Sequence, residues 1–196
     1  MPELVMIAGP NGAGKTTLAF QLLPKFLAIR QFVNADEIAR GLNPIAPEQM
    51  AITAGRLMLQ RLDNLVKDRQ SLVFETTGAS TVFVPLIKRA RQEGYSIRLC
   101  YLWLANPEIA KSRVRLRQRQ GGHGIADDII ERRYYRGLYN VLHRYMALSD
   151  VSEFYRSVDQ VIDKYDLIAA YSGLKLQIFM PEIWQAMNEA VDHERE

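Results

Sequence analysis

The chain has 196 residues, of which 48% are hydrophobic and 24% are charged. These proportions are ordinary for a globular protein and exclude a collagen-like, coiled-coil or largely disordered chain. The length suits one compact core, so we expect residues 1–196 to form a single domain. The formal net charge is only +3, so the distribution of charge along the chain is more informative than its sum.

Cysteine content and hydropathy indicate the compartment. The single cysteine, Cys100, cannot form an internal disulfide, so an oxidising environment would bring no benefit. The N-terminus enters the strand-like run Leu4–Ala8 almost at once, and no apolar run is long enough to span a bilayer. We therefore expect a cytoplasmic protein without a membrane partner.

Short β-branched or aromatic runs alternate with longer amphipathic stretches along the chain. This alternation is typical of an α/β fold with three layers, in which helices cover both faces of a mostly parallel sheet. The five expected strands are Leu4–Ala8, Phe32–Asn34, Ser71–Phe74, Ser96–Leu104 and Glu153–Val158. The expected helices are Lys15–Leu23, Pro47–Lys67, Val82–Glu93, Glu108–Gln120 and Asp127–Ser149.

The region from about residue 106 to residue 149 is rich in arginine and is divided by glycines at positions 121, 122 and 124. Its two predicted helices therefore form a hairpin with a glycine hinge, which we interpret as a helical lid on the domain. Beyond it, residues 175–179 have the pattern of a strand, and residues 181–191 have that of a closing helix.

The strongest motif is Gly9-Pro-Asn-Gly-Ala-Gly-Lys-Thr16, which matches G-x-x-x-x-G-K-[ST] between a predicted strand and a predicted helix. The backbone of such a loop wraps around phosphates, the lysine reaches the β and γ phosphates, and the hydroxyl of Thr16 ligates Mg²⁺. We therefore expect the fold class to be a P-loop NTPase that binds a nucleoside triphosphate and Mg²⁺. The expected nucleotide-binding residues are Gly9, Asn11, Gly12, Ala13, Gly14, Lys15, Thr16 and Thr17.

Two carboxylates are expected at the carboxyl ends of strands, where open α/β sheets bind their ligands. Asp36 follows the strand at residues 32–34, and Glu75 follows the next one. One such group would accept the proton of an attacking hydroxyl and the other would orient magnesium or its water. Spacing alone leaves open which does which, and each could instead cap a following helix.

Arginines recur at helical spacing in the predicted lid. Arg113 and Arg117 share one helix face, and Arg115 and Arg119 share another, so only one pair can face a nucleotide. Beyond the hinge, Arg132, Arg133 and Arg136 lie close together on the second helix. Such a lid would neutralise the charge of a transferring phosphoryl group, although a solvated basic surface has the same sequence pattern.

Four motifs in order extend the argument beyond the P-loop. They are GPNGAGKTT at residues 9–17, VNADEIARGLNP at 33–44, FETT at 74–77 and RQGGHGIADDIIERRYYRG at 119–137. Together they resemble the zeta-toxin family of P-loop kinases over roughly residues 4–145.

The resemblance implies a kinase that transfers the γ-phosphate of ATP to a hydroxyl of a sugar nucleotide, UDP-N-acetylglucosamine, and that an antitoxin protein restrains. It implies that Lys15 and Thr16 hold ATP and magnesium, that Asp36 is the base and that Glu75 binds the sugar-nucleotide side. Arginines near the hinge would clamp phosphate. The implied catalytic residues are Lys15, Asp36, Glu75, Arg119, Arg132 and Arg133.

Two other functions fit parts of the pattern. A P-loop kinase for another small molecule, such as a nucleoside, a sugar acid or an antibiotic, would share the scaffold, because fold does not determine substrate. A nucleotide-dependent nucleic-acid-binding protein would use the basic hairpin, but few aromatic residues lie between its arginines to stack on bases. Nucleic acid is therefore the least expected partner.

Overall fold

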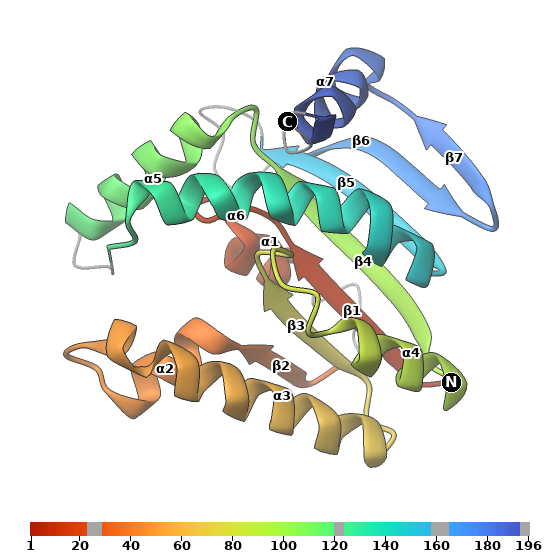
Figure 1. Ribbon diagram of the computed structural model, residues 1–196. Helices are drawn as coiled ribbons and strands as arrows, with labels where there is room; N and C mark the ends of the chain where they lie inside the picture. Colours follow the sequence, from red (N-terminus) through yellow and green to blue (C-terminus); the bar gives the residue numbers. More distant parts are fainter. Residues whose placement is uncertain (23–28, 120–123, 158–164, 193–196) are drawn as a thin grey trace.

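The computed structural model describes residues 1–22, 29–119, 124–157 and 165–192. One sheet with the strand order β2-β3-β1-β4-β5-β6-β7 forms the centre of the molecule (Figure 1). Its strands are β1 (Glu3–Ala8), β2 (Gln31–Asn34), β3 (Leu72–Thr76), β4 (Ser96–Trp103), β5 (Val151–Ser157), β6 (Tyr165–Ser172) and β7 (Lys175–Ile178).

The predicted five strands are present, but the sheet has seven, so the predicted strand count was wrong. The five predicted strands run parallel, whereas β6 pairs antiparallel with β5 and β7 pairs antiparallel with β6. Within β6 only Ile168 and Ala169 are fully buried. Two of the central residues of β6 are alanines, Ala169 and Ala170, and alanine is depleted in strands, so the sequence signal for this strand is weak.

The helices are α1 (Lys15–Leu22), α2 (Ala35–Leu42), α3 (Ala51–Lys67), α4 (Val84–Gln92), α5 (Pro107–Arg119), α6 (Asp127–Asn140) and α7 (Pro181–Asp192). The predicted helix from Pro47 begins as a 3₁₀ turn, Pro47–Met50, and the one from Asp127 ends in a π-helical turn, Val141–Tyr145, and a 3₁₀ turn, Met146–Leu148. The hinge at residues 121–123 and the predicted ends at residues 23, 120 and 158 lie outside the described residues.

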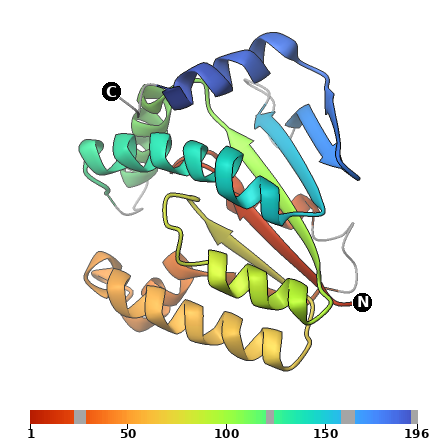
Figure 2. The same ribbon diagram turned by 45° about the vertical axis from the view of Figure 1, so that its right-hand side comes forward.

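Helices cover both faces of the sheet (Figures 1 and 2). The apolar side chains of β1 alternate between these faces, so both faces need a cover. Leu4 and Met6 face a core shared with α3, α4 and α7, whereas Val5 and Ile7 face a second core shared with α1 and α5. The expected three-layer α/β/α architecture is therefore confirmed. None of the helices in the described ranges is long and apolar enough to cross a membrane.

Helix α6 belongs to both cores. Its early residues Ile130 and Tyr134 pack in the core with α1 and α5, whereas Leu138 and Val141 pack in the core on the other face. The helix therefore crosses over the carboxyl edge of the parallel strands, opposite α2 and α3 (Figures 1 and 2). This crossing places α6 beside the turn that follows β3.

Candidate active site

The P-loop connects β1 to α1 in the conformation that its sequence predicts. Gly12 and Gly14 have φ angles of +77° and +88°, which side chains other than glycine rarely adopt. A Cβ at Gly9 would lie 2.4 Å from the carbonyl oxygen of Leu102, so this glycine lets the loop pass over β4. The loop ends at the N-terminus of α1, where free backbone N–H groups favour an anion.

Lys15 and Glu75 form an ion pair at the base of this loop. The Nζ of Lys15 lies 3.7 Å from Oε1 of Glu75, and both side chains are less than one-tenth exposed, at 8% and 9%. Nζ also donates a hydrogen bond of 3.0 Å to the carbonyl oxygen of Pro10. Burial lowers the pKa of Lys15, and the nearby carboxylates of Glu75 and Asp36 oppose that shift.

Two further side chains hold the Glu75 carboxylate. Its Oε2 accepts hydrogen bonds from Oγ1 of Thr16 at 2.7 Å and from Nδ2 of Asn34 at 3.0 Å. These bonds tie the end of β3 to the start of α1 and to the end of β2. Glu75 is therefore fixed beside Thr16, and its oxygens are already occupied as acceptors.

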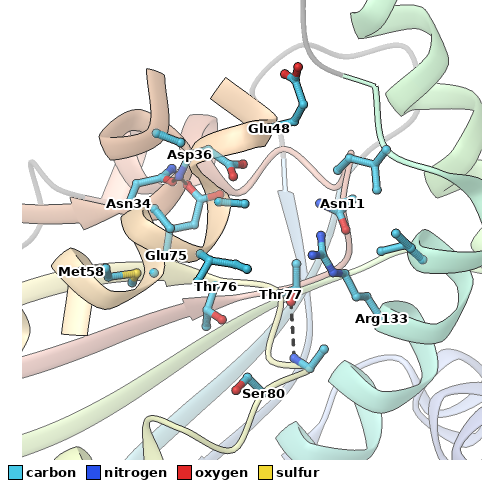
Figure 3. A pocket seen from close by; sticks show the side chains of 18 of the residues that line it. Asn11, Asn34, Asp36, Glu48, Met58, Glu75, Thr76, Thr77, Ser80 and Arg133 are labelled. Atoms are coloured by element: carbon cyan, nitrogen blue, oxygen red, sulfur yellow. Dashed lines mark hydrogen bonds between the residues drawn. The ribbon is translucent and has the colours of Figure 1, made fainter. Parts of the chain in front are cut away.

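Asp36 has a different environment. It lies in the first turn of α2, where its backbone N–H donates to Oδ1 of Asn34 at 2.8 Å. Asn34 therefore caps the helix, and the Asp36 side chain is exposed and lines the cleft (Figure 3). No hydrogen bond or ion pair to another described residue engages its carboxylate. The alternative that Asp36 serves as the N-cap is wrong, because Asn34 has that position.

These groups line a cleft of about 1230 Å³. One wall consists of α2, α3 and the turn between them, the other consists of α6 and the end of α5, and the turn after β3 closes the base. Small-molecule sites commonly have about 300–1,000 Å³. The cleft is therefore large enough for a nucleotide and a second substrate together.

The structure separates the arginines that the sequence could not separate. Arg117, Arg132 and Arg133 line the cleft, and Arg133 points toward Asn11 of the P-loop in Figure 3. Arg119 is exposed and lies outside the cleft lining. Among the described residues, no ion pair or hydrogen bond engages Arg117, Arg132 or Arg133, so their charges are available to a ligand.

The cleft lining also includes Asn34, Arg56 and Arg117, which were not among the predicted site residues. The sequence left Arg117 open, as part of one of two alternative helix faces. Asn34 could have been found, since an asparagine at a strand end just before Asp36 is a common helix cap. Arg56 belongs to α3 and lines the wall opposite α6. Its position on a long amphipathic helix carries no local signal, and nothing in the spacing of Arg117 indicated which face of α5 meets the cleft.

Two ion pairs join the lid helices α5 and α6. The Nζ of Lys111 in α5 lies 2.7 Å from Oε2 of Glu131 in α6, and Arg115 forms a second ion pair with Asp127. Arg113 is occupied elsewhere, since its guanidinium donates to the Ser157 hydroxyl after β5 at 3.3 Å. The described parts of the predicted hairpin are thus one packed unit, and Arg117, Arg132 and Arg133, which pair with no other described residue, lie on the side of the cleft.

A P-loop at the first strand, carboxylates at the ends of neighbouring strands and an arginine-bearing helix across the cleft define a kinase-type P-loop phosphotransferase. The sequence model described as zeta toxin matches residues 1–172, so it covers most of the chain. The chain belongs to the zeta toxin family, and the expected family is thereby confirmed.

Individual proteins are similar to this chain in sequence or in fold. An uncharacterized protein of Haemophilus influenzae is 30% identical over 132 residues, which are 67% of this chain and 92% of the relative. A chain of the AvrRxo1-ORF1:AvrRxo1-ORF2 crystal structure with sulphate ions has a TM-score of 0.72 at 16% identity, over 95% of this chain but only 63% of that one. A chain of the structure of the PezAT toxin-antitoxin system of Streptococcus pneumoniae has a TM-score of 0.65 at 15% identity, over 100% of this chain and 88% of that one.

Proposed function

We propose that this protein transfers the γ-phosphate of ATP to a hydroxyl group of a sugar nucleotide such as UDP-N-acetylglucosamine. The observation that carries the proposal is the convergence on one cleft of the P-loop ion pair, the carboxylate of Asp36 and the arginines Arg117, Arg132 and Arg133, none of which pairs with another described residue. Membership of the zeta toxin family supports a sugar nucleotide as the acceptor, and the cleft is large enough for such a molecule beside ATP.

In this proposal the P-loop amides and Lys15 hold the phosphates of ATP. Thr16 and Glu75 present only oxygen ligands, which are the ligands that Mg²⁺ prefers, so the residues at this position fit the ion. When bound, Mg²⁺ would neutralise charge on the β and γ phosphates. Lys15 would supply a second positive charge at the same place, and the exclusion of water would strengthen its attraction for the phosphates.

Asp36 is the better candidate for the base. Both oxygens of Glu75 contact neighbours, namely Lys15, Thr16 and Asn34, whereas the carboxylate of Asp36 is free to approach an acceptor. It would accept the proton of the attacking hydroxyl, and Arg132 and Arg133 would neutralise the phosphoryl group as it moves. The position of Glu75 beside Thr16 favours an orienting role on the metal side over direct contact with the sugar.

A comparison of two arginines on α5 tests the lid. We expect Arg117→Ala to weaken ATP binding about tenfold, since it removes a charge that faces the phosphates. Arg119→Ala, two residues further on the same helix, serves as the matched control and should change affinity by less than about twofold. Calorimetric titration with a non-hydrolysable ATP analogue gives both values. A larger loss for Arg119 would restore the role that the resemblance implies for that residue.

The acceptor is tested by product analysis. The protein is incubated with ATP and Mg²⁺ in separate reactions, each of which contains one class of acceptor: UDP-sugars, nucleosides, sugar acids or antibiotics. Mass spectrometry then identifies any compound that gains one phosphoryl group. A phosphorylated UDP-sugar is the expected result. Phosphorylation of compounds from another class alone would show that the acceptor is not a UDP-sugar, while the assignment as a kinase would remain.

We also propose an antitoxin protein as a partner, since a structural neighbour is a toxin-antitoxin system. Nucleic acid is a poor fit, because the unpaired arginines Arg132 and Arg133 line a cleft rather than an open surface. The cytoplasmic location stays a prediction from the sequence.

A further inference from the structure

The second half of α6 lies against the turn that follows β3. At Gly137 a Cβ would lie 2.5 Å from the carbonyl oxygen of Thr77, so only glycine allows this approach. On the other side of the contact, Gly78 has a φ of +78°, and a Cβ there would lie 3.2 Å from Val141. Two backbones thus meet directly, and neither position has room for a side chain.

Hydrogen bonds join the same two segments. Asn140 is buried, and its Nδ2 donates to the carbonyl oxygens of Gly78 and Ala79, both at 3.1 Å. The hydroxyl of Tyr145 donates to the carbonyl oxygen of Ser80. We name this set of contacts, from Gly137, Asn140 and Tyr145 to residues 77–80, the latch.

The latch joins two segments that carry groups of cleft residues. Arg132, Arg133 and Arg136 line the cleft from the part of α6 up to Gly137, and the turn lines it with Thr76, Thr77, Ala79 and Ser80. A side-chain amide that donates both of its protons to one turn fixes both the distance and the rotation of the helix. The π-helical turn Val141–Tyr145 begins directly after Asn140, and such turns often mark functional positions.

We propose that Asn140 is a positioning residue, which holds the arginines of α6 at a fixed place relative to the P-loop and the turn after β3. The inference rests on the proposed function, since it assigns the arginines to the transferring phosphoryl group. It limits any movement of the lid to α5 and the residues of α6 that precede Arg132, because the latch connects the rest of α6 to the sheet.

The test is a double-mutant cycle between Asn140→Ala and Arg133→Ala. Its readout is the affinity for ADP with aluminium fluoride and Mg²⁺, a probe that imitates the transferring phosphoryl group and needs no acceptor. We expect Arg133→Ala to weaken binding about tenfold in the native background but less than about twofold when Asn140 is already alanine. Without the latch Arg133 is out of position, so replacing Arg133 then causes little further loss of affinity.

Leu138→Ala is the matched control. Leu138 is a buried core residue of the same helix, and its truncation destabilises the protein without removing the amide hydrogen bonds. In that background Arg133→Ala should keep its full effect. A structural role for Asn140 alone would give equal losses for Arg133→Ala in all backgrounds, and this additivity would overturn the proposal. An Arg133→Ala variant with native affinity would also overturn it.

Tyr145→Phe is the second route if Asn140→Ala does not fold. This variant removes only one hydroxyl of the latch, and the same cycle with Arg133→Ala should show a smaller coupling of the same sign. Absence of coupling in that cycle would contradict the proposal. Because the cycle uses only a nucleotide probe, it stays measurable even if UDP-N-acetylglucosamine proves not to be the acceptor.

Discussion

Replacing Asp36 with asparagine should lower the rate of phosphoryl transfer by about 10²- to 10⁴-fold, the usual contribution of a general base. The affinity for ATP should stay within about twofold of the native value. The local structure should persist, because the helix cap uses the backbone N–H of Asp36 and the side chain of Asn34. Single-turnover transfer kinetics and nucleotide titration measure the two quantities separately.

Glu37→Gln is the control for this variant. Glu37 is the next residue of α2, is exposed and pairs with Arg40. Its replacement changes the net charge of the helix by the same amount but should leave transfer close to native, since exposed ion pairs contribute little. Undiminished transfer in Asp36→Asn would show that another group accepts the proton.

Lys15→Met should lower the kcat/KM of ATP by about 10³-fold, which corresponds to about 4 kcal/mol of transition-state stabilisation. Methionine has a similar length but no charge, so the phosphates lose their buried cation. Thermal stability should change little. Burial disfavours the charged lysine, and hydrogen bonds from Thr16 and Asn34 still hold the Glu75 carboxylate after the replacement.

Lys15→Arg separates charge from shape in the same assay. The side chain of Lys15 is only 8% exposed, and the planar guanidinium of arginine differs from an ammonium group in shape and in the direction of its donors. We therefore expect a loss of transfer almost as large as that of Lys15→Met, although the positive charge is conserved. Native kcat/KM in Lys15→Met, measured from initial rates over a range of ATP concentrations, would contradict the assignment of the P-loop lysine.

The parts of the fold that could be predicted have strong local signals. The P-loop lies between β1 and α1 because its glycines and lysine encode both the turn and the anion site. The central parallel strands β1, β3 and β4 carry apolar runs, since both of their faces are largely buried. The antiparallel β6 was missed, because its stability comes from pairing with β5 rather than from its own residues.

The candidate site divides in the same way. Asp36 and Glu75 could be placed at one edge, because carboxyl ends of parallel strands meet there. Their different surroundings could not be predicted, since the hydrogen bonds of Glu75 to Thr16 and Asn34 join residues that lie 59 and 41 positions away. The selection of Arg117 over Arg119 similarly depends on how α5 packs, which no spacing of arginines reveals.

The most direct test of the central claim follows the γ-phosphate itself. The protein is mixed with ATP labelled at the γ-phosphate, Mg²⁺ and UDP-N-acetylglucosamine, and the label is separated into sugar nucleotide and free orthophosphate. The proposed site predicts label on the sugar nucleotide with native protein and none above background with Asp36→Asn. Label that appears only as orthophosphate, or equally with both proteins, would contradict it.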